Sequence, residues 1–156
     1  MSEKIIHIYY ATMTGNAEDL AKNAEKRVQA AGYAPKLLDL SDVSPSCIKE
    51  NATALFIVST WGDGEPPEDA EDFYAKLENC SDNMESLNYS ILGLGDSSYP
   101  DFNEFARCLD KELLRCHAQP FLERVEADFD FEDTYDEWID KVLESLPTVV
   151  KQTSPV

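Results

Sequence analysis

Basic residues are scarce in this chain, because 13 lysines and arginines stand against 31 aspartates and glutamates and give a formal net charge of −18. Such a charge repels nucleic acids and anionic membranes over a Debye length, which is about 10 Å at 0.1 M salt. We therefore expect neither nucleic acid nor a membrane as a partner, and we expect partner proteins with basic surfaces. The acids are concentrated in residues 61–106, which hold twelve of them and one base, Lys76.

Metal-binding and disulfide patterns are also missing. The four cysteines are Cys47, Cys80, Cys108 and Cys116, and the two histidines are His7 and His117. No C-x-x-C pair occurs, so the spacing suits neither a zinc site nor a redox dithiol. No apolar run approaches the roughly 20 residues that a membrane span needs. We expect free thiols, no metal, and a cytoplasmic protein.

Strand-like and helix-like segments alternate along the chain. Apolar runs predict five strands, at residues 5–10, 36–38, 54–58, 89–93 and 120–122. Helical periodicity predicts four helices: residues 17–31 closed by Gly32, a short one around 73–77, one over 102–113 opened by Asp101, and one over 135–146 ending at Pro147. The alternation predicts an α/β fold, with a doubly wound five-stranded parallel sheet and helices on both faces. We expect one domain, residues 1–147, and a flexible tail, residues 148–156.

Doubly wound sheets bind ligands at the carboxyl ends of their strands, so the segments after Tyr10, Val58 and Leu92 are the candidates for a site. The first has Thr12, Thr14 and Asn16 at a predicted helix start. A helix N-terminus with added hydroxyl donors can hold a phosphate, although the same residues can simply cap the helix. The Walker pattern is absent, which argues against a nucleoside triphosphate.

The second and third segments each combine an aromatic ring with a pair of glycines. Trp61 precedes Gly62 and Gly64, and Tyr99 follows Gly93 and Gly95. Each ring could merely cover the core, but two flat rings beside a phosphate cradle could sandwich a phosphorylated planar cofactor. Neither segment has the G-x-G-x-x-G dinucleotide pattern. A further acidic run over residues 123–133 lacks EF-hand spacing, and we interpret it as a solvated face.

With these residues in view, the sequence resembles the flavodoxin family. It carries T-x-T-G-N at residues 12–16, T-W-G-D-G-E at 60–65 and G-L-G-D-S-S-Y-x-x-F at 93–102. The last two motifs also resemble the FMN domains of diflavin reductases, and the absence of a long insertion in the last strand is typical of short-chain flavodoxins. The resemblance implies a flavodoxin-like fold, FMN as cofactor, and no catalytic residue.

The resemblance also implies the residues that bind FMN. The phosphate would lie against Thr12, Thr14, Asn16, Ala17 and Ser59, the ribityl chain near Thr60 and Asp96, and the ring between Trp61 and Tyr99. Many relatives have threonine where this chain has Ala17, which removes one hydroxyl. The full expected set is Thr12, Met13, Thr14, Gly15, Asn16, Ala17, Ser59, Thr60, Trp61, Gly62, Asp63, Gly64, Leu94, Gly95, Asp96, Tyr99, Phe102 and Asn103.

The function implied is that of a low-potential, monomeric one-electron carrier between a flavodoxin or ferredoxin reductase and an acceptor protein. By resemblance, the Gly62–Asp63 peptide turns toward the flavin to stabilise its semiquinone, and Asp63, Glu65 and Asp96 disfavour the anionic reduced form. Two alternatives stay open: an FMN-dependent NAD(P)H:quinone reductase, and the FMN module of a split diflavin reductase. A phosphoreceiver domain is a poor match, because its paired acids are missing after Tyr10.

Overall fold

The computed structural model describes residues 5–11, 16–43, 53–59, 71–80, 83–85, 87–94, 104–128 and 131–153. Its strands are β1 (Ile5–Ala11), β2 (Ala34–Asp39), β3 (Thr53–Ser59), β4 (Asn88–Leu94), β5 (Gln119–Pro120) and β6 (Val125–Ala127). Its helices are α1 (Asn16–Ala30), α3 (Glu71–Glu78), α4 (Glu104–Arg115) and α5 (Glu132–Thr153), with a 3-10 turn, η1, over Leu40–Asp42. The predicted alternation of strands and helices is therefore confirmed.

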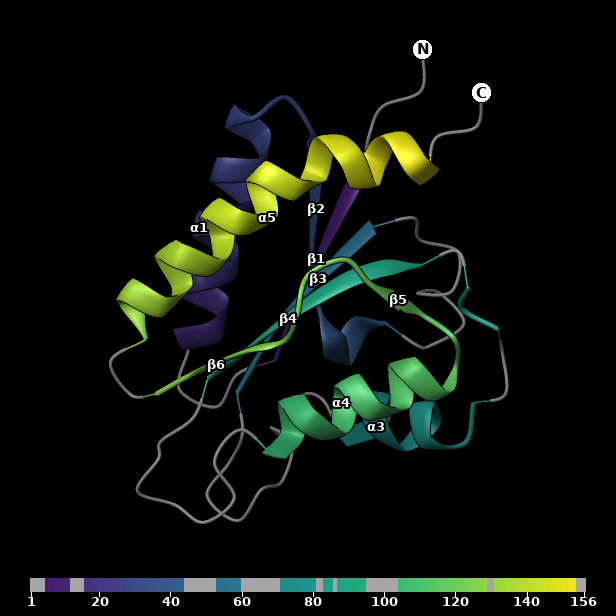
Figure 1. The fold of residues 1–156 in the computed structure, drawn as a ribbon. Coiled ribbons are helices and arrows are strands. Elements are labelled where there is room, and N and C mark those ends of the chain that lie inside the picture. The colour runs from purple at the N-terminus through teal and green to yellow at the C-terminus, as the bar shows by residue number, and fades with distance from the viewer. Residues whose placement is uncertain are drawn as a thin grey trace.

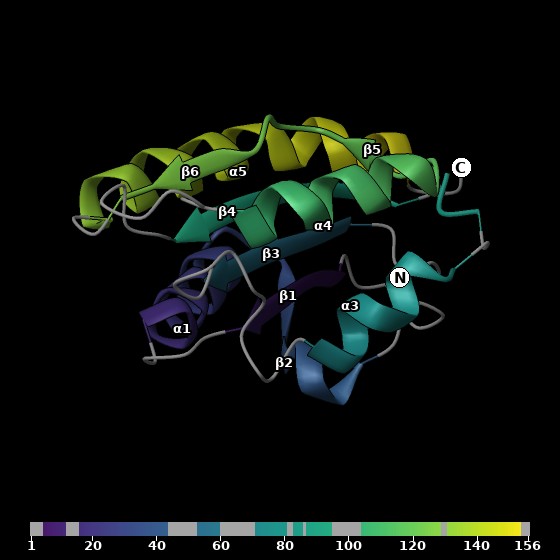
Figure 2. The ribbon, with the colours of Figure 1, turned by 90° about the horizontal axis from the view of Figure 1, so that it is seen from below.

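The strands form one parallel sheet in the order β2-β1-β3-β4-β5, with β6 also paired to β4. Figure 1 shows α1 and α5 on one face of this sheet and α3 and α4 on the other. Seen from below, α3 and α4 lie in front of the strands (Figure 2). The winding reverses between β1 and β3, which makes the fold doubly wound.

The two faces of the sheet bury separate apolar cores, because successive strand side chains point in opposite directions. Ile6 and Ile8 of β1 pack toward α1 and α5, whereas Tyr9 packs toward α3 and α4. In the central strand β3, every residue from Ala54 to Val58 is fully buried. That is the reason for its unbroken apolar sequence.

The last strand differs from the expectation. We predicted one strand over residues 120–122, but the edge is split into β5, which pairs with Asn88 and Tyr89, and β6, which pairs with Leu92–Leu94. Two residues of β4, 90 and 91, therefore face the four residues 121–124. Such an excess bends the strand away from its partner.

Side chains from α4 hold the interrupted edge in place. Arg124, within the interruption, donates to Asp110 of α4 at 2.5 Å and to Glu126 of β6 at 3.0 Å. Arg107 of α4 binds the same Glu126 carboxylate through two nitrogens, at 2.8 and 3.0 Å. These two arginines lower the pKa of Glu126, with Arg107 contributing most. Glu126 is thus a member of an ion-pair network and not part of a solvated acidic face.

Helix α5 is longer than the sequence indicated. We expected it to end at Pro147, but it continues to Thr153. A proline in a helix leaves the carbonyl four residues earlier without its usual donor. Pro147 is exposed on the helix surface, and the helix continues past it. The domain limits and the nature of the chain's last residues stay predictions.

Candidate functional site

The carboxyl ends of β1, β3 and β4 lie level with one another at the reversal point of the sheet. Ala11, the last residue of β1, pairs with Val58, and Ser59, the last residue of β3, pairs with Leu94, the last residue of β4. Ala11, Ser59 and Leu94, the residues that precede the three candidate segments, therefore end neighbouring strands at one edge of the sheet. Doubly wound folds bind ligands at this edge.

Helix α1 begins next to this edge. It starts at Asn16, with only four residues between it and the end of β1, and its second residue, Ala17, is fully buried against the sheet. A small side chain here lets the first turn pack close to the strands. The free N–H groups and positive dipole end of that turn favour an anion.

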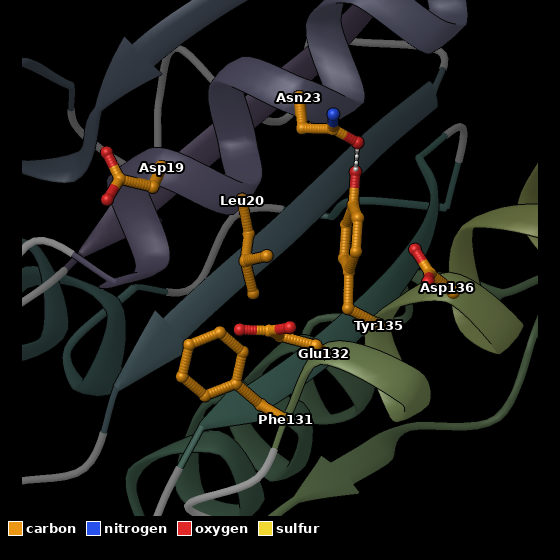
Figure 3. A pocket seen from close by; sticks show the side chains of 7 residues that line it. All are labelled: Asp19, Leu20, Asn23, Phe131, Glu132, Tyr135 and Asp136. Carbon is orange, nitrogen blue, oxygen red and sulfur yellow. Dashed lines mark hydrogen bonds between the residues drawn. The ribbon is translucent and has the colours of Figure 1, made fainter.

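Two acids also lie in the first turn of α1, and the structure shows where each is engaged. Glu18 forms an ion pair of 2.9 Å with Lys22, one turn further along the helix. Asp19 lines a pocket on the α5 side (Figure 3). Burial raises the pKa of the nearby Tyr10 hydroxyl, and Glu18 and Asp39 raise it further. Glu18 and Asp39 therefore place negative charge near the Tyr10 hydroxyl.

The pocket beside the helix start has a volume of about 400 Å³ and lies between α1 and the start of α5. Its lining residues are Asp19, Leu20, Asn23, Phe131, Glu132, Tyr135 and Asp136. Figure 3 shows the Glu132 carboxylate between Leu20 and Phe131, and the Tyr135 hydroxyl donating to the Asn23 Oδ1 atom at 2.7 Å. Burial raises the pKa of Tyr135, so it stays a neutral donor. The Glu132 carboxylate beside Leu20 and Phe131 would suit a cation with an aliphatic stem.

This pocket was not predicted from the sequence. Its walls come from two helices more than one hundred residues apart, and no local motif links them. Sequence reasoning assigned Glu132 to a solvated acidic run; the structure keeps it exposed but turns its carboxylate into the pocket (Figure 3).

Of the residues predicted to bind FMN, four belong to the described part of the chain. Asn16 and Ala17 are at the start of α1, Ser59 ends β3, and Leu94 ends β4 with 5% of its surface exposed. The register pairs Ser59 with Leu94 at the carboxyl edge of the sheet, and Asn16 and Ala17 begin the helix that follows β1. The other fourteen lie outside the described residues: Thr12, Met13, Thr14, Gly15, Thr60, Trp61, Gly62, Asp63, Gly64, Gly95, Asp96, Tyr99, Phe102 and Asn103.

The part of the chain that the structure describes lacks the features of a metal site and of a membrane span. No group of three or more histidine, cysteine or acidic side chains there could hold a metal ion. No helix in those ranges combines the length and apolar character needed to cross a membrane.

Known proteins resemble this chain in sequence and in fold. The family profile "Flavodoxin" matches residues 8–139. The sulfite reductase [NADPH] flavoprotein alpha-component of Bacillus subtilis is 35% identical over 144 residues, which are 92% of this chain and 24% of that protein. The corresponding protein of Neisseria meningitidis serogroup A is 36% identical over 142 residues, which are 90% and 24% of the two chains. The chain thus spans about a quarter of the length of these curated relatives.

Solved structures agree with the observed fold. A flavodoxin of Streptococcus pneumoniae TIGR4 superposes with a TM-score of 0.81 at 27% identity and covers 92% of this chain and 98% of its own. A short-chain flavodoxin associated with a PDU bacterial microcompartment reaches a TM-score of 0.82 at 24% identity, covering 97% and 99%. At 24% identity, the likeness to this short-chain flavodoxin shows a shared fold only.

Proposed function

The chain belongs to the flavodoxin family, and we propose that it binds FMN at the carboxyl edge of its sheet and carries electrons one at a time between partner proteins. FMN is the cofactor of this family, and when bound it supplies a centre that takes up and releases single electrons. The observation that supports the proposal best is the strand register, because it brings the three motif-bearing segments to one edge.

The phosphate would lie at the start of α1. The first-turn N–H groups of this helix point to the edge at which residues 12–15 join β1 to α1. The side chain of Ala17 is apolar and fully buried, so it does not compete with the phosphate for these N–H groups. The carboxylate of Glu18 is engaged by Lys22 in an ion pair. Thr12 and Thr14, in the adjoining segment, would add hydroxyl donors.

The flavin ring would lie over the ends of β3 and β4. Ser59 and Leu94 pair with each other there, so the segments with Trp61 and Tyr99 start about one strand spacing apart, ~4.8 Å. Two aromatic side chains on these segments would cover the two faces of the ring and exclude water. The Gly62–Asp63 peptide would then be next to the ring edge, where a rotating backbone group can accept a proton-linked hydrogen bond.

Partner recognition would use the acidic surface around this edge. Asp19, Glu132 and Asp136 extend the negative potential from the site onto α1 and α5. A lysine or arginine of a reductase or acceptor could enter this pocket during a short encounter. We further propose that the protein is a monomer and that it works in the cytoplasm.

A visible absorption spectrum of the purified chain tests the proposal directly. We expect flavin bands, and mass spectrometry of the heat-released cofactor should identify FMN. Trp61→Ala should weaken FMN binding about tenfold, which corresponds to ~1.4 kcal/mol of lost stacking. Trp138→Phe is the matched control, since Trp138 is the chain's other tryptophan and is buried between α5 and β4. A colourless protein that does not take up added FMN would refute the assignment.

A second function is favoured by one observation, the 35% identity to a sulfite reductase flavoprotein against 27% or less to the flavodoxins of similar fold. The chain could serve as the FMN module of a two-component reductase whose other component takes electrons from NADPH. Electron exchange with a separately prepared FAD-containing NADPH reductase tests this function. Rapid reduction by NADPH alone would instead favour a quinone reductase.

A further inference from the structure

Two cysteines that are far apart in the sequence meet at the ends of α3 and α4. Cys80 follows α3 by two residues, and Cys116 directly follows α4. The Cys116 Sγ atom lies 3.9 Å from the Cys80 carbonyl oxygen, and the Cys80 thiol is close enough to raise the pKa of the Cys116 thiol. Their sequence spacing gave no sign of a dithiol, because the contact is made only by the packing of the two helices.

Backbone hydrogen bonds fix both cysteines in position. The Cys80 amide donates to the Leu77 carbonyl at 3.1 Å, and the Met84 amide donates to the Cys116 carbonyl at 2.7 Å. The guanidinium of Arg115 donates to the carbonyls of Leu77 at 2.8 Å and Cys80 at 2.9 Å, so it ties the end of α4 to the end of α3. Side chains held in contact need little backbone movement to reach the S–S bond length of about 2 Å.

We propose that Cys80 and Cys116 are an oxidation-sensitive dithiol, which closes to an intramolecular disulfide when a low-molecular-weight disulfide such as oxidised glutathione is the oxidant. In reducing compartments such disulfides are usually transient and redox-sensing. This modification site is separate from the proposed FMN function.

The two thiols have different roles in the exchange. Cys80 is half-buried and is the thiol that solvent can reach, whereas Cys116 is 2% exposed. The Cys80 thiolate attacks oxidised glutathione, forms a mixed disulfide and releases one glutathione thiolate. Cys116 then loses its proton to solvent and attacks the Cys80 sulfur, which releases the second glutathione. One glutathione disulfide is reduced to two thiols, and the two protein thiols become one disulfide.

Charges around the pair support this order. Burial raises the pKa of the Cys116 thiol, and the neighbouring Arg115 guanidinium opposes that rise. The raised pKa disfavours the Cys116 thiolate as the first attacking group, and Arg115 stabilises that thiolate when it forms in the second step. Cys108, on α4, hydrogen-bonds with Tyr74 of α3 and takes no part in the pair.

The dithiol lies at the edge of the sheet opposite the candidate FMN site. Gln119, three residues after Cys116, pairs with Asn88 at the start of β4, whereas the site is at the end of β4. Closing the disulfide should therefore leave a flavin spectrum unchanged. The test below needs no FMN, so it can fail or succeed independently of the proposed function.

The experiment is a redox titration of the full chain in glutathione buffers, with acid quenching, alkylation of free thiols and mass mapping. Trypsin separates the cysteines, because Lys76, Arg107, Lys111, Arg115 and Arg124 are the flanking cleavage sites. We expect a disulfide that joins peptide 77–107 to peptide 116–124, with loss of two hydrogens from the intact mass. Cys116→Ser should stop at a glutathione adduct on Cys80, and Cys80→Ser should leave Cys116 unmodified. Cys108→Ser should behave as the parent chain.

Three results would overturn the proposal. One is that all thiols stay reduced in the most oxidising buffer. Another is that Cys108 or Cys47 is oxidised before Cys80. The third is that the parent chain and the Cys116→Ser chain accumulate the same glutathione adduct, since then Cys116 would not resolve it.

Discussion

The indole Nε1 of Trp138 donates a hydrogen bond of 2.9 Å to the hydroxyl of Ser90. Both residues are almost fully buried, and they join α5 to the middle of β4. Ser90 is one of two buried polar residues in the described core, and the indole explains its presence. The bond fixes the helix that lines the acidic pocket to the strand that ends at the candidate FMN site.

Ser90→Ala should lower the free energy of unfolding by about 1–3 kcal/mol, because it leaves a buried indole N–H without an acceptor. Urea unfolding followed by circular dichroism measures the change. The double variant Ser90→Ala with Trp138→Phe should lose less than the sum of the single changes, since neither polar group then remains. If the losses of the two single variants instead add up to the loss of the double variant, the hydrogen bond contributes nothing to the unfolding free energy.

Helices α1 and α4 end in the same motif with different residues. Gly32 has φ +98° and His117 has φ +72°, and in both helices the next amide bonds back five residues, Tyr33 to Val28 at 3.3 Å and Ala118 to Leu113 at 3.0 Å. A side chain in this left-handed region costs roughly 1 kcal/mol. His117→Gly should therefore raise the unfolding free energy by about that amount.

Gly32→Ala makes the opposite change at the corresponding position of α1, since it adds a side chain where φ is positive. Open space surrounds the position where its Cβ would lie, so only the backbone conformation opposes it. We expect a loss of about 1 kcal/mol by the same urea assay. If both variants unfold with the same free energy as the parent, a side chain at positive φ has no measurable cost at these two positions.

His7 should make folding weaken in mild acid. Burial lowers its pKa from 6.5, and Lys36 lowers it further, although a backbone hydrogen bond to Thr53 acts in the other direction. The unfolded chain then binds the proton more readily, so this contribution is full above pH 6.5 and is lost as the pH falls toward the lower folded value.

The urea midpoint compared at about pH 7.5 and about pH 5.5 measures this effect, whose limit is ~1.4 kcal/mol per pH unit. His7→Gln should reduce the difference between the two midpoints. His117→Gln is the control, because that histidine is exposed, and it should keep the difference. An unchanged pH dependence in His7→Gln would remove His7 as the cause.

Electron exchange with a basic reductase should depend on salt. Raising the ionic strength from about 0.01 to about 0.1 M shortens the Debye length from about 30 to about 10 Å and should slow exchange about tenfold. Stopped-flow absorbance measures the rate. Neutralising Asp19 and Asp136 of the pocket should reduce the salt dependence, whereas Glu144→Gln, on the exposed side of α5 outside the pocket, should not. Rates indifferent to salt would argue against electrostatic docking.

Local patterns in the sequence were sufficient for most of the fold. The apolar run 54–58 is the central strand, and Gly32 ends α1 as expected. Both follow from short-range rules: an unbroken apolar run is typical of a strand buried on both faces, and positive φ costs little at glycine. The last strand and the end of α5 were less predictable, because ion pairs from α4 to Arg124 and Glu126, and the exposure of Pro147, are set by neighbours distant in sequence.

The sequence by itself determined the strand–helix alternation, the acidic charge and the three motifs that identify the family and its cofactor. Only the tertiary structure decided that β1, β3 and β4 end within one residue of one another in the register, that α1 and α5 enclose an acidic pocket, and that Cys80 meets Cys116. The physical reason is that propensity and hydrophobic period act over a few residues, whereas register and helix packing depend on contacts between segments tens of residues apart.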